Sequence, residues 1–125
     1  MNKKNIFQES IDLQFKAKEI GLDWLEVSGV IHKLKEETEE VIEAINTEDK
    51  IAMKEEIGDL LFTVLCLSRH LDINPEEILD QANKKFNFRY IQVLNHLKKQ
   101  DKKYAQYMTY FRTRQNYHTK NSNAD

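Results

Sequence analysis

Residues 35–44 read KEETEEVIEA and place five glutamates on one short segment of the chain. At the period of an α-helix, Glu37 and Glu40 fall on the edge of an apolar stripe. Glu39 and Glu43 point away from that stripe and are expected to form a solvated face. The stripe consists of Val27, Val30, Ile31, Leu34, Val41, Ile42 and Ile45. The segment therefore predicts an amphipathic helix with two carboxylates at the rim of the core.

A second acidic pair, Glu56 and Asp59, lies in the apolar segment KEEIGDLLFTVLCL of residues 54–67. This segment is apolar on nearly every side, a pattern that is typical of a buried helix. Carboxylates in such surroundings are costly unless a cation compensates them. On the same helix Lys54 points to the opposite side, so a cation from outside the chain is expected.

The four carboxylates are expected to converge if these two helices are neighbours and antiparallel. Hard oxygen ligands favour Mg²⁺, with Mn²⁺ as a substitute, over zinc. The predicted ligands are Glu37, Glu40, Glu56 and Asp59. The alternative is an acidic surface with one or two acids in salt bridges to a neighbouring helix. A di-iron carboxylate site is excluded, because the chain has no Glu-x-x-His pair.

The rest of the chain also has helical periodicity and no strand-like alternation. Helices are expected over residues 4–20, from 23 to about 45, from 47 to about 71, from 75 past 97, and near 101–114. The short connection at residues 46–49 makes the second and third helices neighbours. These lengths and short connections predict an all-α fold, an antiparallel four-helix bundle with an additional C-terminal helix. The last ten residues are expected to be disordered.

Local signals place the ends of these helices. Gly21 is a plausible C-cap of the first helix. Asp23, with Glu26 three residues later, predicts a capping box for the second, and Thr47 predicts the cap of the third. Asn74 followed by Pro75 predicts the start of the fourth helix.

The composition indicates one domain in 125 residues, with a basic C-terminal extension. Residues 1–97 carry 12 Lys and Arg against 19 Asp and Glu, a net charge of −7, whereas residues 98–125 carry 7 against 2, a net charge of +5. The expected division is an all-α domain at 1–97 and a basic extension at 98–125, a helix followed by a disordered tail. This acidic body is not that of a nucleic-acid-binding domain.

Compartment signals favour a reducing, cytoplasmic setting. The single cysteine, Cys66, cannot form an internal disulfide. The N-terminal residues MNKKNIFQES contain no apolar segment that would predict a signal peptide. No apolar run is long enough to span a bilayer.

A cationic pair follows on the fourth expected helix, in the stretch QANKKFNFRY. Lys85 and Arg89 are four residues apart on one face, with Asn83 nearby. A divalent metal held by carboxylates, together with such a cationic pair, can neutralise and bind the phosphate oxygens of a polyphosphate. The alternative is that both cations pair with surface acids.

These motifs resemble those of the MazG-like nucleoside triphosphate pyrophosphohydrolases, an all-α family. EETEE and EEIGD reproduce the family's EExxE…ExxD pattern, and ANKKFNFRY is similar to its ANxKFxxRF segment. The resemblance covers about residues 20–92. It implies that the metal ligands are the same four acids, and that Lys85, Arg89 and Asn83 hold the triphosphate.

The resemblance further implies Mg²⁺-dependent hydrolysis of a nucleoside triphosphate to the monophosphate and pyrophosphate, as part of nucleotide-pool housecleaning. A spare carboxylate, Glu36 or Glu40, would act as the general base. A homodimer or homotetramer is expected, because the family completes its sites with neighbouring helices. The role of residues 98–125 stays open.

The sequence leaves two alternatives. The first is a relative with a narrower substrate, a dUTP or dCTP pyrophosphatase or a phosphoribosyl-ATP pyrophosphohydrolase. The second is a non-catalytic helical module that binds a partner through the basic C-terminal tail. Trp24 could stack on a base, although a buried structural role is the favoured interpretation.

Overall fold

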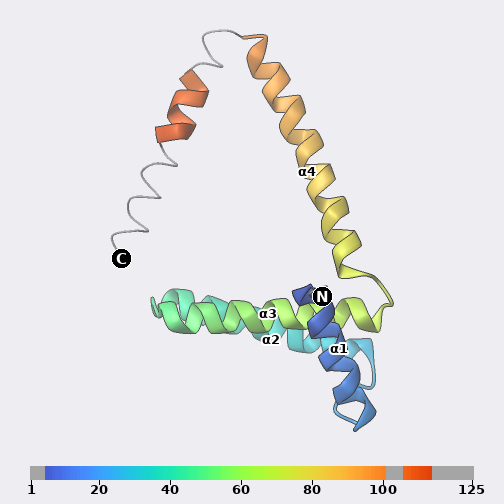
Figure 1. Ribbon diagram of the computed structural model, residues 1–125. Helices are drawn as coiled ribbons and strands as arrows, with labels where there is room; N and C mark the ends of the chain where they lie inside the picture. Colours follow the sequence, from blue (N-terminus) through green and yellow to red (C-terminus); the bar gives the residue numbers. More distant parts are fainter. Residues whose placement is uncertain (1–4, 101–105, 114–125) are drawn as a thin grey trace. The chain divides into compact units, whose positions relative to one another are not determined.

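A computed structural model describes residues 5–100 and 106–113 of the chain. The helices are α1 (Ile6–Glu19), α2 (Val27–Asn46), α3 (Lys50–His70) and α4 (Pro75–Lys98), and residues 106–113 are also helical (Figure 1). The described residues contain no strand, which confirms the all-α fold class. The chain divides into two compact units, Met1–Asp80 and Gln81–Asp125, and each is described by itself.

Helix α1 begins at a side-chain cap and is followed by a glycine in the left-handed conformation. The carboxamide oxygen of Asn5 accepts a hydrogen bond from the amide of Gln8 at 2.7 Å. At the other end Gly21 has a φ of 85°, in the left-handed region that glycine adopts without steric cost. The amides of Gly21 and Leu22 bond back to the carbonyls of the last turn, at Lys18 and Ala17. The prediction that Gly21 closes this helix is confirmed.

Helix α2 begins differently from the prediction. Its N-cap is Glu26, which makes no side-chain capping bond, so the capping box with Asp23 is wrong. Asp23 lies four residues before the first residue of the helix and pairs with residues of α3 instead. The ring of Trp24 lies against Gly29 so closely that a Cβ there would come within 2.9 Å of the ring. Trp24 remains 45% exposed, so the expectation of a buried tryptophan is also wrong.

The connection between α2 and α3 is a tight turn of three residues. Thr47 is the C-cap of α2 and its hydroxyl donates to the carbonyl of Glu43 at 3.0 Å, so the predicted capping of α3 by Thr47 is wrong. Asp49 caps α3 by accepting from the amide of Ala52 at 3.1 Å. Glu48 between them takes a positive φ of 55°. The turn makes α2 and α3 antiparallel neighbours that lie side by side (Figure 1).

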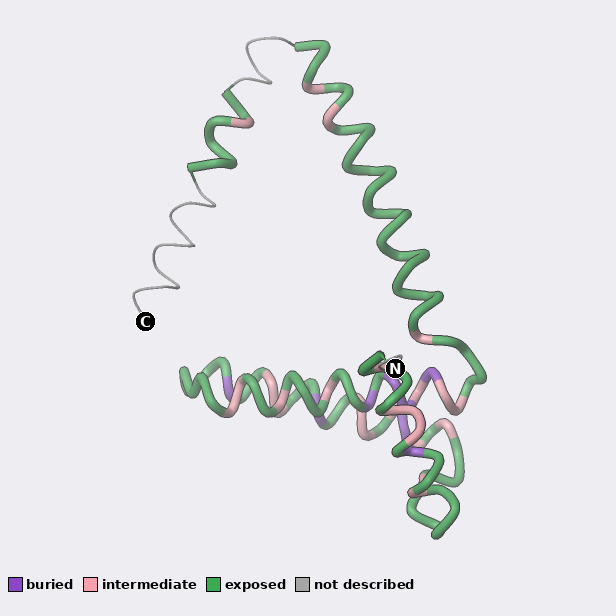
Figure 2. The backbone as a smooth tube through the Cα atoms, in the orientation of Figure 1, coloured by how far each residue is buried: buried purple, intermediate pink, exposed green. Residues whose placement is uncertain are grey.

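The core of the first unit lies between α2 and α3, with α1 packed across α3 (Figure 2). The buried apolar residues among those described are Val30, Ala44, Leu65 and Cys66. On α3, Ile57, Leu61 and Val64 are 47%, 56% and 39% exposed. The expectation that α3 is buried on nearly every side is therefore wrong for the single chain.

Helix α4 starts as predicted, since the carboxamide oxygen of Asn74 accepts from the amide of Glu76 at 2.9 Å. None of its residues is buried within the chain. The packing of α2 on α3 and of α1 on α3 is shown, whereas the four-helix bundle stays a prediction. None of the helices described is long and apolar enough to cross a membrane.

The second unit consists of helical segments in its described part. Tyr107 and Phe111 stack on one face of the segment 106–113, with ring centroids 6.4 Å apart. The predicted fifth helix is thus observed over these residues, while 101–105 and the tail from 114 lie outside the described residues. The division into a domain at 1–97 and an extension at 98–125 stays a prediction.

Candidate metal centre

Three of the four predicted ligands come together between α2 and α3. Carboxylate oxygens of Glu37, Glu56 and Asp59 all lie within 4.8 Å of one another. Glu37 is buried with 4% of its surface exposed, Glu56 is half-buried, and Asp59 is exposed. The group therefore runs from the interior of the helix pair to its surface, because 56 and 59 are one turn apart on α3 and face residue 37 across the antiparallel pair.

Glu40 joins this group through Glu56. A side-chain hydrogen bond with Glu40, followed by burial and by the negative charges of Glu40, Glu37 and Asp59, raises the pKa of Glu56 to about 7. Two carboxylates can share a hydrogen bond only when one of them holds a proton. Without a cation the surrounding acids therefore disfavour the charged form of Glu56, and a divalent metal at this group would favour it.

Lys33 is the site residue that the sequence analysis missed. Its Nζ lies 3.0 Å from Oε1 of Glu37 and 3.9 Å from Oε1 of Glu36. The hydrogen bond to Glu37 raises the pKa of Lys33, so the ammonium form is favoured. The expectation that only an external cation faces the acids is corrected by this contact. The signal was present, because lysine and glutamate four residues apart on a helix are neighbours.

Two carboxylate oxygens in the group have no partner. Oε2 of Glu37 and Oε2 of Glu56 are buried from solvent and accept no hydrogen bond. A buried acceptor left unpaired is costly, and it is costlier for a charged group. An oxygen-only donor set with two orphaned oxygens fits Mg²⁺ or Mn²⁺, which prefer carboxylate ligands. The residues present therefore suit the metal that the sequence predicts.

A shallow cavity of about 360 Å³ opens beside the acids. Its lining includes Glu40 and Glu56 together with Glu43, which the sequence assigned to a solvated face. Glu36, the other candidate base, has 53% of its side chain exposed next to Lys33. Both candidate bases thus lie on α2 beside the predicted ligands.

The predicted phosphate-binding residues lie in the second unit. Asn83, Lys85 and Arg89 are exposed on α4. Among the described residues, neither Lys85 nor Arg89 forms an ion pair with a surface acid. Their role stays a prediction.

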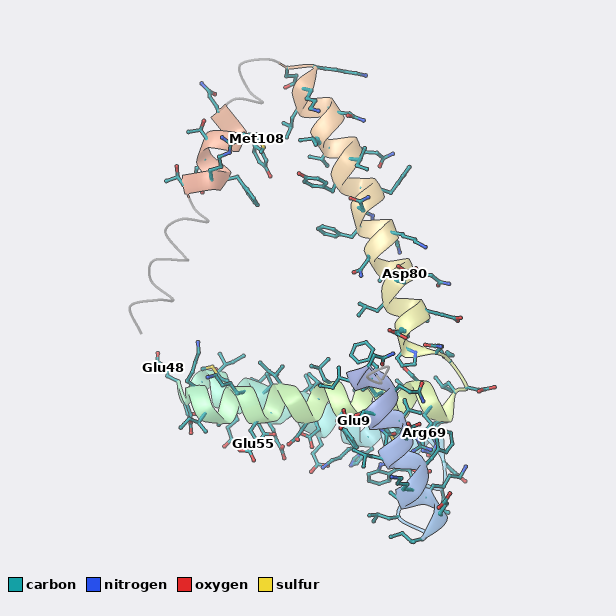
Figure 3. The ribbon with its side chains drawn as sticks, in the orientation of Figure 1. Glu9, Glu48, Glu55, Arg69, Asp80 and Met108 are labelled. Carbon is teal, nitrogen blue, oxygen red and sulfur yellow. The ribbon has the colours of Figure 1, made fainter. Side chains whose placement is uncertain are left out.

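A second polar cluster, also missed, lies where α1 crosses α3 near Arg69 (Figure 3). Arg69 donates to both oxygens of Asp23, at 2.7 and 3.0 Å, and to Oε1 of Gln14 at 2.9 Å. His70 lies 3.1 Å from the same carboxylate. The Arg69 contact holds the pKa of Asp23 far below its usual range and raises the pKa of Arg69. This cluster carries its own cation, so it clamps α1 and the 20–26 segment to α3.

Cys66 belongs to the same region. Its Sγ lies 3.6 Å from Nη2 of Arg69, and burial raises the pKa of the thiol. Asp23, Cys66 and His70 also place ligand atoms within 4.8 Å of one another. The guanidinium between Asp23 and Cys66 opposes any further cation there, because it already neutralises the carboxylate.

Comparison with known proteins decides the family. Residues 26–94 match the family described as the MazG nucleotide pyrophosphohydrolase domain. The chain belongs to this family. The matched span contains all of α2 and α3 and therefore the whole MazG acidic group, Glu37, Glu40, Glu56 and Asp59. It also contains Asn83, Lys85 and Arg89.

Individual relatives agree with the MazG assignment. The chain is 41% identical over 78 residues to the nucleoside triphosphate pyrophosphohydrolase/pyrophosphatase MazG of Thermotoga maritima, a match that covers 62% of this chain and 29% of that protein. It is 36% identical over 83 residues to the nucleoside triphosphate pyrophosphohydrolase of Escherichia coli K12, over 65% of this chain and 32% of that protein. These matches thus span about a third of the relatives' length.

A solved structure is also similar to this chain. The crystal structure of YPJD from Bacillus subtilis matches with a TM-score of 0.60 and 28% identity, over 71% of this chain and 99% of that one. The likeness extends across almost the entire YPJD chain. It supports the helical fold that positions the acids.

Proposed function

We propose that the chain hydrolyses nucleoside triphosphates to the nucleoside monophosphate and pyrophosphate. The observation that carries this proposal is the group of carboxylates with two orphaned buried oxygens, Glu37 Oε2 and Glu56 Oε2. Family membership supports the same reaction, since both the Thermotoga and the Escherichia relatives bear the name of a nucleoside triphosphate pyrophosphohydrolase. Nucleotide-pool housecleaning is the proposed role.

Mg²⁺ is the proposed cofactor, held by Glu37, Glu40, Glu56 and Asp59. When bound, it would neutralise the phosphate oxygens and make an attacking water more acidic. In the reaction the water oxygen bonds to phosphorus, the bond to the pyrophosphate oxygen breaks, and the water gives its proton to a carboxylate. Glu36 or Glu40 is the proposed acceptor of that proton.

The two candidate bases can be separated by kinetics. A residue that only accepts the proton should lower kcat on substitution and leave metal affinity unchanged, whereas a ligand should lower metal affinity. Glu40 touches Glu56, while Glu36 is exposed beside Lys33. We therefore expect Glu40→Gln to weaken Mg²⁺ binding and Glu36→Gln to leave it intact.

Lys85, Arg89 and Asn83 are the proposed phosphate-binding residues. Lysine and arginine bind phosphate oxygens through charge-assisted hydrogen bonds. The expected effect of Lys85→Ala or Arg89→Ala is a higher KM for the triphosphate. Metal binding measured without nucleotide should not change in either variant.

We further propose that the chain is a cytoplasmic homodimer or homotetramer. Ile57, Leu61 and Val64 lie on one face of α3 and remain 39% to 56% exposed. A stripe of this kind on a hairpin of helices favours burial against another helix. Sedimentation should show an oligomer that Leu61→Glu converts to a monomer.

The deciding experiment is incubation with each nucleoside triphosphate, with and without Mg²⁺, followed by separation of the products. Monophosphate and pyrophosphate that disappear in Glu56→Gln and without metal would establish the activity. Turnover of only dUTP, dCTP or phosphoribosyl-ATP would select the narrower alternatives. No turnover on any of them would leave the non-catalytic module, to be tested by removal of residues 98–125.

A further inference from the structure

Lys33 contacts the acidic group from the preceding turn of α2. Its Nζ lies 3.0 Å from Oε1 of Glu37 and 3.9 Å from Oε1 of Glu36. The side chain of Lys33 is 35% exposed and that of Glu37 is 6% exposed, so the shorter ion pair has one partner in the interior and one near the surface. Water screens this pair less than a pair on an open helix surface, and the contact is correspondingly stronger.

The two oxygens of the Glu37 carboxylate have different surroundings. Oε1 is paired with the ammonium group of Lys33, whereas Oε2 is buried and has no hydrogen-bond partner. A carboxylate binds a divalent cation either through one oxygen or through both. Because Nζ is 3.0 Å from Oε1, a Ca²⁺ ion bound to Oε1 at about 2.4 Å would lie within about 5.4 Å of the ammonium charge. The repulsion between the two cations therefore favours binding through Oε2 alone.

The number of oxygens that Glu37 offers matters differently to Mg²⁺ and to Ca²⁺. Mg²⁺ demands a near-ideal octahedron at about 2.0–2.1 Å and keeps several waters, so one oxygen from each carboxylate is sufficient. Ca²⁺ takes roughly six to eight oxygens at about 2.3–2.6 Å and binds carboxylates through one or both of their oxygens. A buried carboxylate that offers a single oxygen thus removes a ligand that Ca²⁺ can use, while Mg²⁺ loses none.

We propose that Lys33 is a positioning residue that makes the acidic group select Mg²⁺ over Ca²⁺, by leaving Glu37 with one free oxygen. The proposal rests on the proposed function for the presence of a metal, and on the contact between Lys33 and Glu37 for the choice of ion. Lys33 acts through Glu37 and not as a ligand, because an ammonium group has no lone pair. Removal of the ammonium group frees Oε1, and Glu37 then binds Ca²⁺ through both oxygens.

The test is calorimetric titration of the full chain with Mg²⁺ and with Ca²⁺, without nucleotide, so that no turnover is required. Lys33→Met removes the ammonium group and keeps a long, flexible side chain. Loss of a positive charge should tighten the binding of both ions, so the informative quantity is the ratio of the two dissociation constants. We expect this ratio to move towards Ca²⁺ by about threefold or more in Lys33→Met. A smaller change, or a change towards Mg²⁺, overturns the proposal.

Two further variants separate positioning from charge. Lys33→Arg keeps a cationic donor at the same place and should retain the ratio of the unmodified protein. Lys35→Met removes the same charge from an exposed side chain two residues further on, and should leave the ratio unchanged. A ratio in Lys33→Arg or in Lys35→Met that matches the ratio in Lys33→Met overturns the proposal. If Lys33→Met does not fold, Lys33→Gln, which is also uncharged, takes its place with the same criteria.

Turnover of nucleoside triphosphates is measured separately on the same proteins. Turnover by the unmodified chain, with an ion selectivity that does not depend on Lys33, would overturn this inference and leave the proposed function intact. A shift of selectivity in Lys33→Met, without turnover by the unmodified chain, would support the inference and overturn the proposed function. Binding of neither ion would overturn the role of Lys33 and the proposed metal site together.

Discussion

Lys33 and Glu37 lie one helical turn apart on α2, with Nζ and Oε1 3.0 Å from each other, while the second oxygen of the same carboxylate is buried without a partner. A single carboxylate thus has one oxygen paired inside the chain and one left over. The chain neutralises its acidic group only in part, and the orphaned oxygens leave room for a divalent cation.

Substitution of Lys33 tests this partial neutralisation of Glu37. Lys33→Ala leaves the buried carboxylate of Glu37 without its counter-charge, and we expect the metal-free protein to lose about 1–2 kcal/mol of unfolding free energy. Saturating Mg²⁺ should recover most of the loss, as ligand binding to the folded state does. Urea unfolding with and without Mg²⁺ measures both effects. Lys35→Ala, at an exposed position two residues on, is the control. An equal loss in both variants would contradict the interpretation.

The raised pKa of Glu56 predicts a pH dependence. The folded value of about 7 lies above the ordinary 4.5, so the metal-free folded protein binds the proton more tightly than the unfolded chain. The free energy of unfolding should therefore fall as the pH rises from about 4.5 to about 7. Glu56→Gln should flatten this slope and preserve or raise the stability of the metal-free protein. Denaturation curves across that pH range test it, with the exposed Glu55→Gln as the control. An unchanged or steeper slope in Glu56→Gln would refute the assignment.

The clamp between Asp23 and Arg69 should matter more for stability than any capping role. The side chains are 12% and 5% exposed, so Asp23→Asn leaves a buried guanidinium without its counter-charge, and we expect a loss of about 3–5 kcal/mol. Because the folded pKa of Asp23 is lowered, its contribution is present above its ordinary value of 3.8 and is lost as the pH falls further. Thermal unfolding at neutral and acid pH measures both. Glu19→Gln, on the exposed face of α1, should have little effect.

Glu48 in the turn between α2 and α3 is a site where stability can be gained. Its φ of 55° suits glycine better than a side chain with a Cβ. Glu48→Gly should therefore raise the free energy of unfolding by about 0.5–1 kcal/mol. Glu55→Gly, inside α3 at an exposed position, should lower it by about 1 kcal/mol. Chemical denaturation of the two variants gives the comparison, and a loss of stability in Glu48→Gly would show that the turn has another constraint.

Gly29 should be intolerant of any side chain while Trp24 keeps its place. A Cβ at this position would come within 2.9 Å of the indole ring, closer than atoms pack. Gly29→Ala is thus expected to displace the ring, despite the better helix propensity of alanine. A changed emission spectrum of the single tryptophan would report the shift. An unchanged spectrum would mean that the contact relaxes without moving Trp24.

Much of the acidic group could be predicted from the sequence because its geometry is local. Residues 37 and 40 share a face of one helix, 56 and 59 share a face of the next, and a three-residue turn forces the two helices to be antiparallel. Periodicity and a short connection were therefore sufficient to predict that Glu37, Glu56 and Asp59 converge. Lys33 obeys the same rule of spacing, because it lies four residues before Glu37 on α2.

The role of Asp23 was decided by tertiary structure. Its local signal, an acid three residues before Glu26, favours a capping box. In the fold Asp23 instead pairs with Arg69, 46 residues away. The first turn of α2 therefore has no side-chain capping bond to its backbone amides. A bidentate pair of full charges at a site of low exposure outweighs one capping bond to a neutral amide. Sequence periodicity by itself determined the helices and the acids on them, whereas the long-range pairing of Asp23, Arg69 and Gln14 arose only when α1 packed on α3.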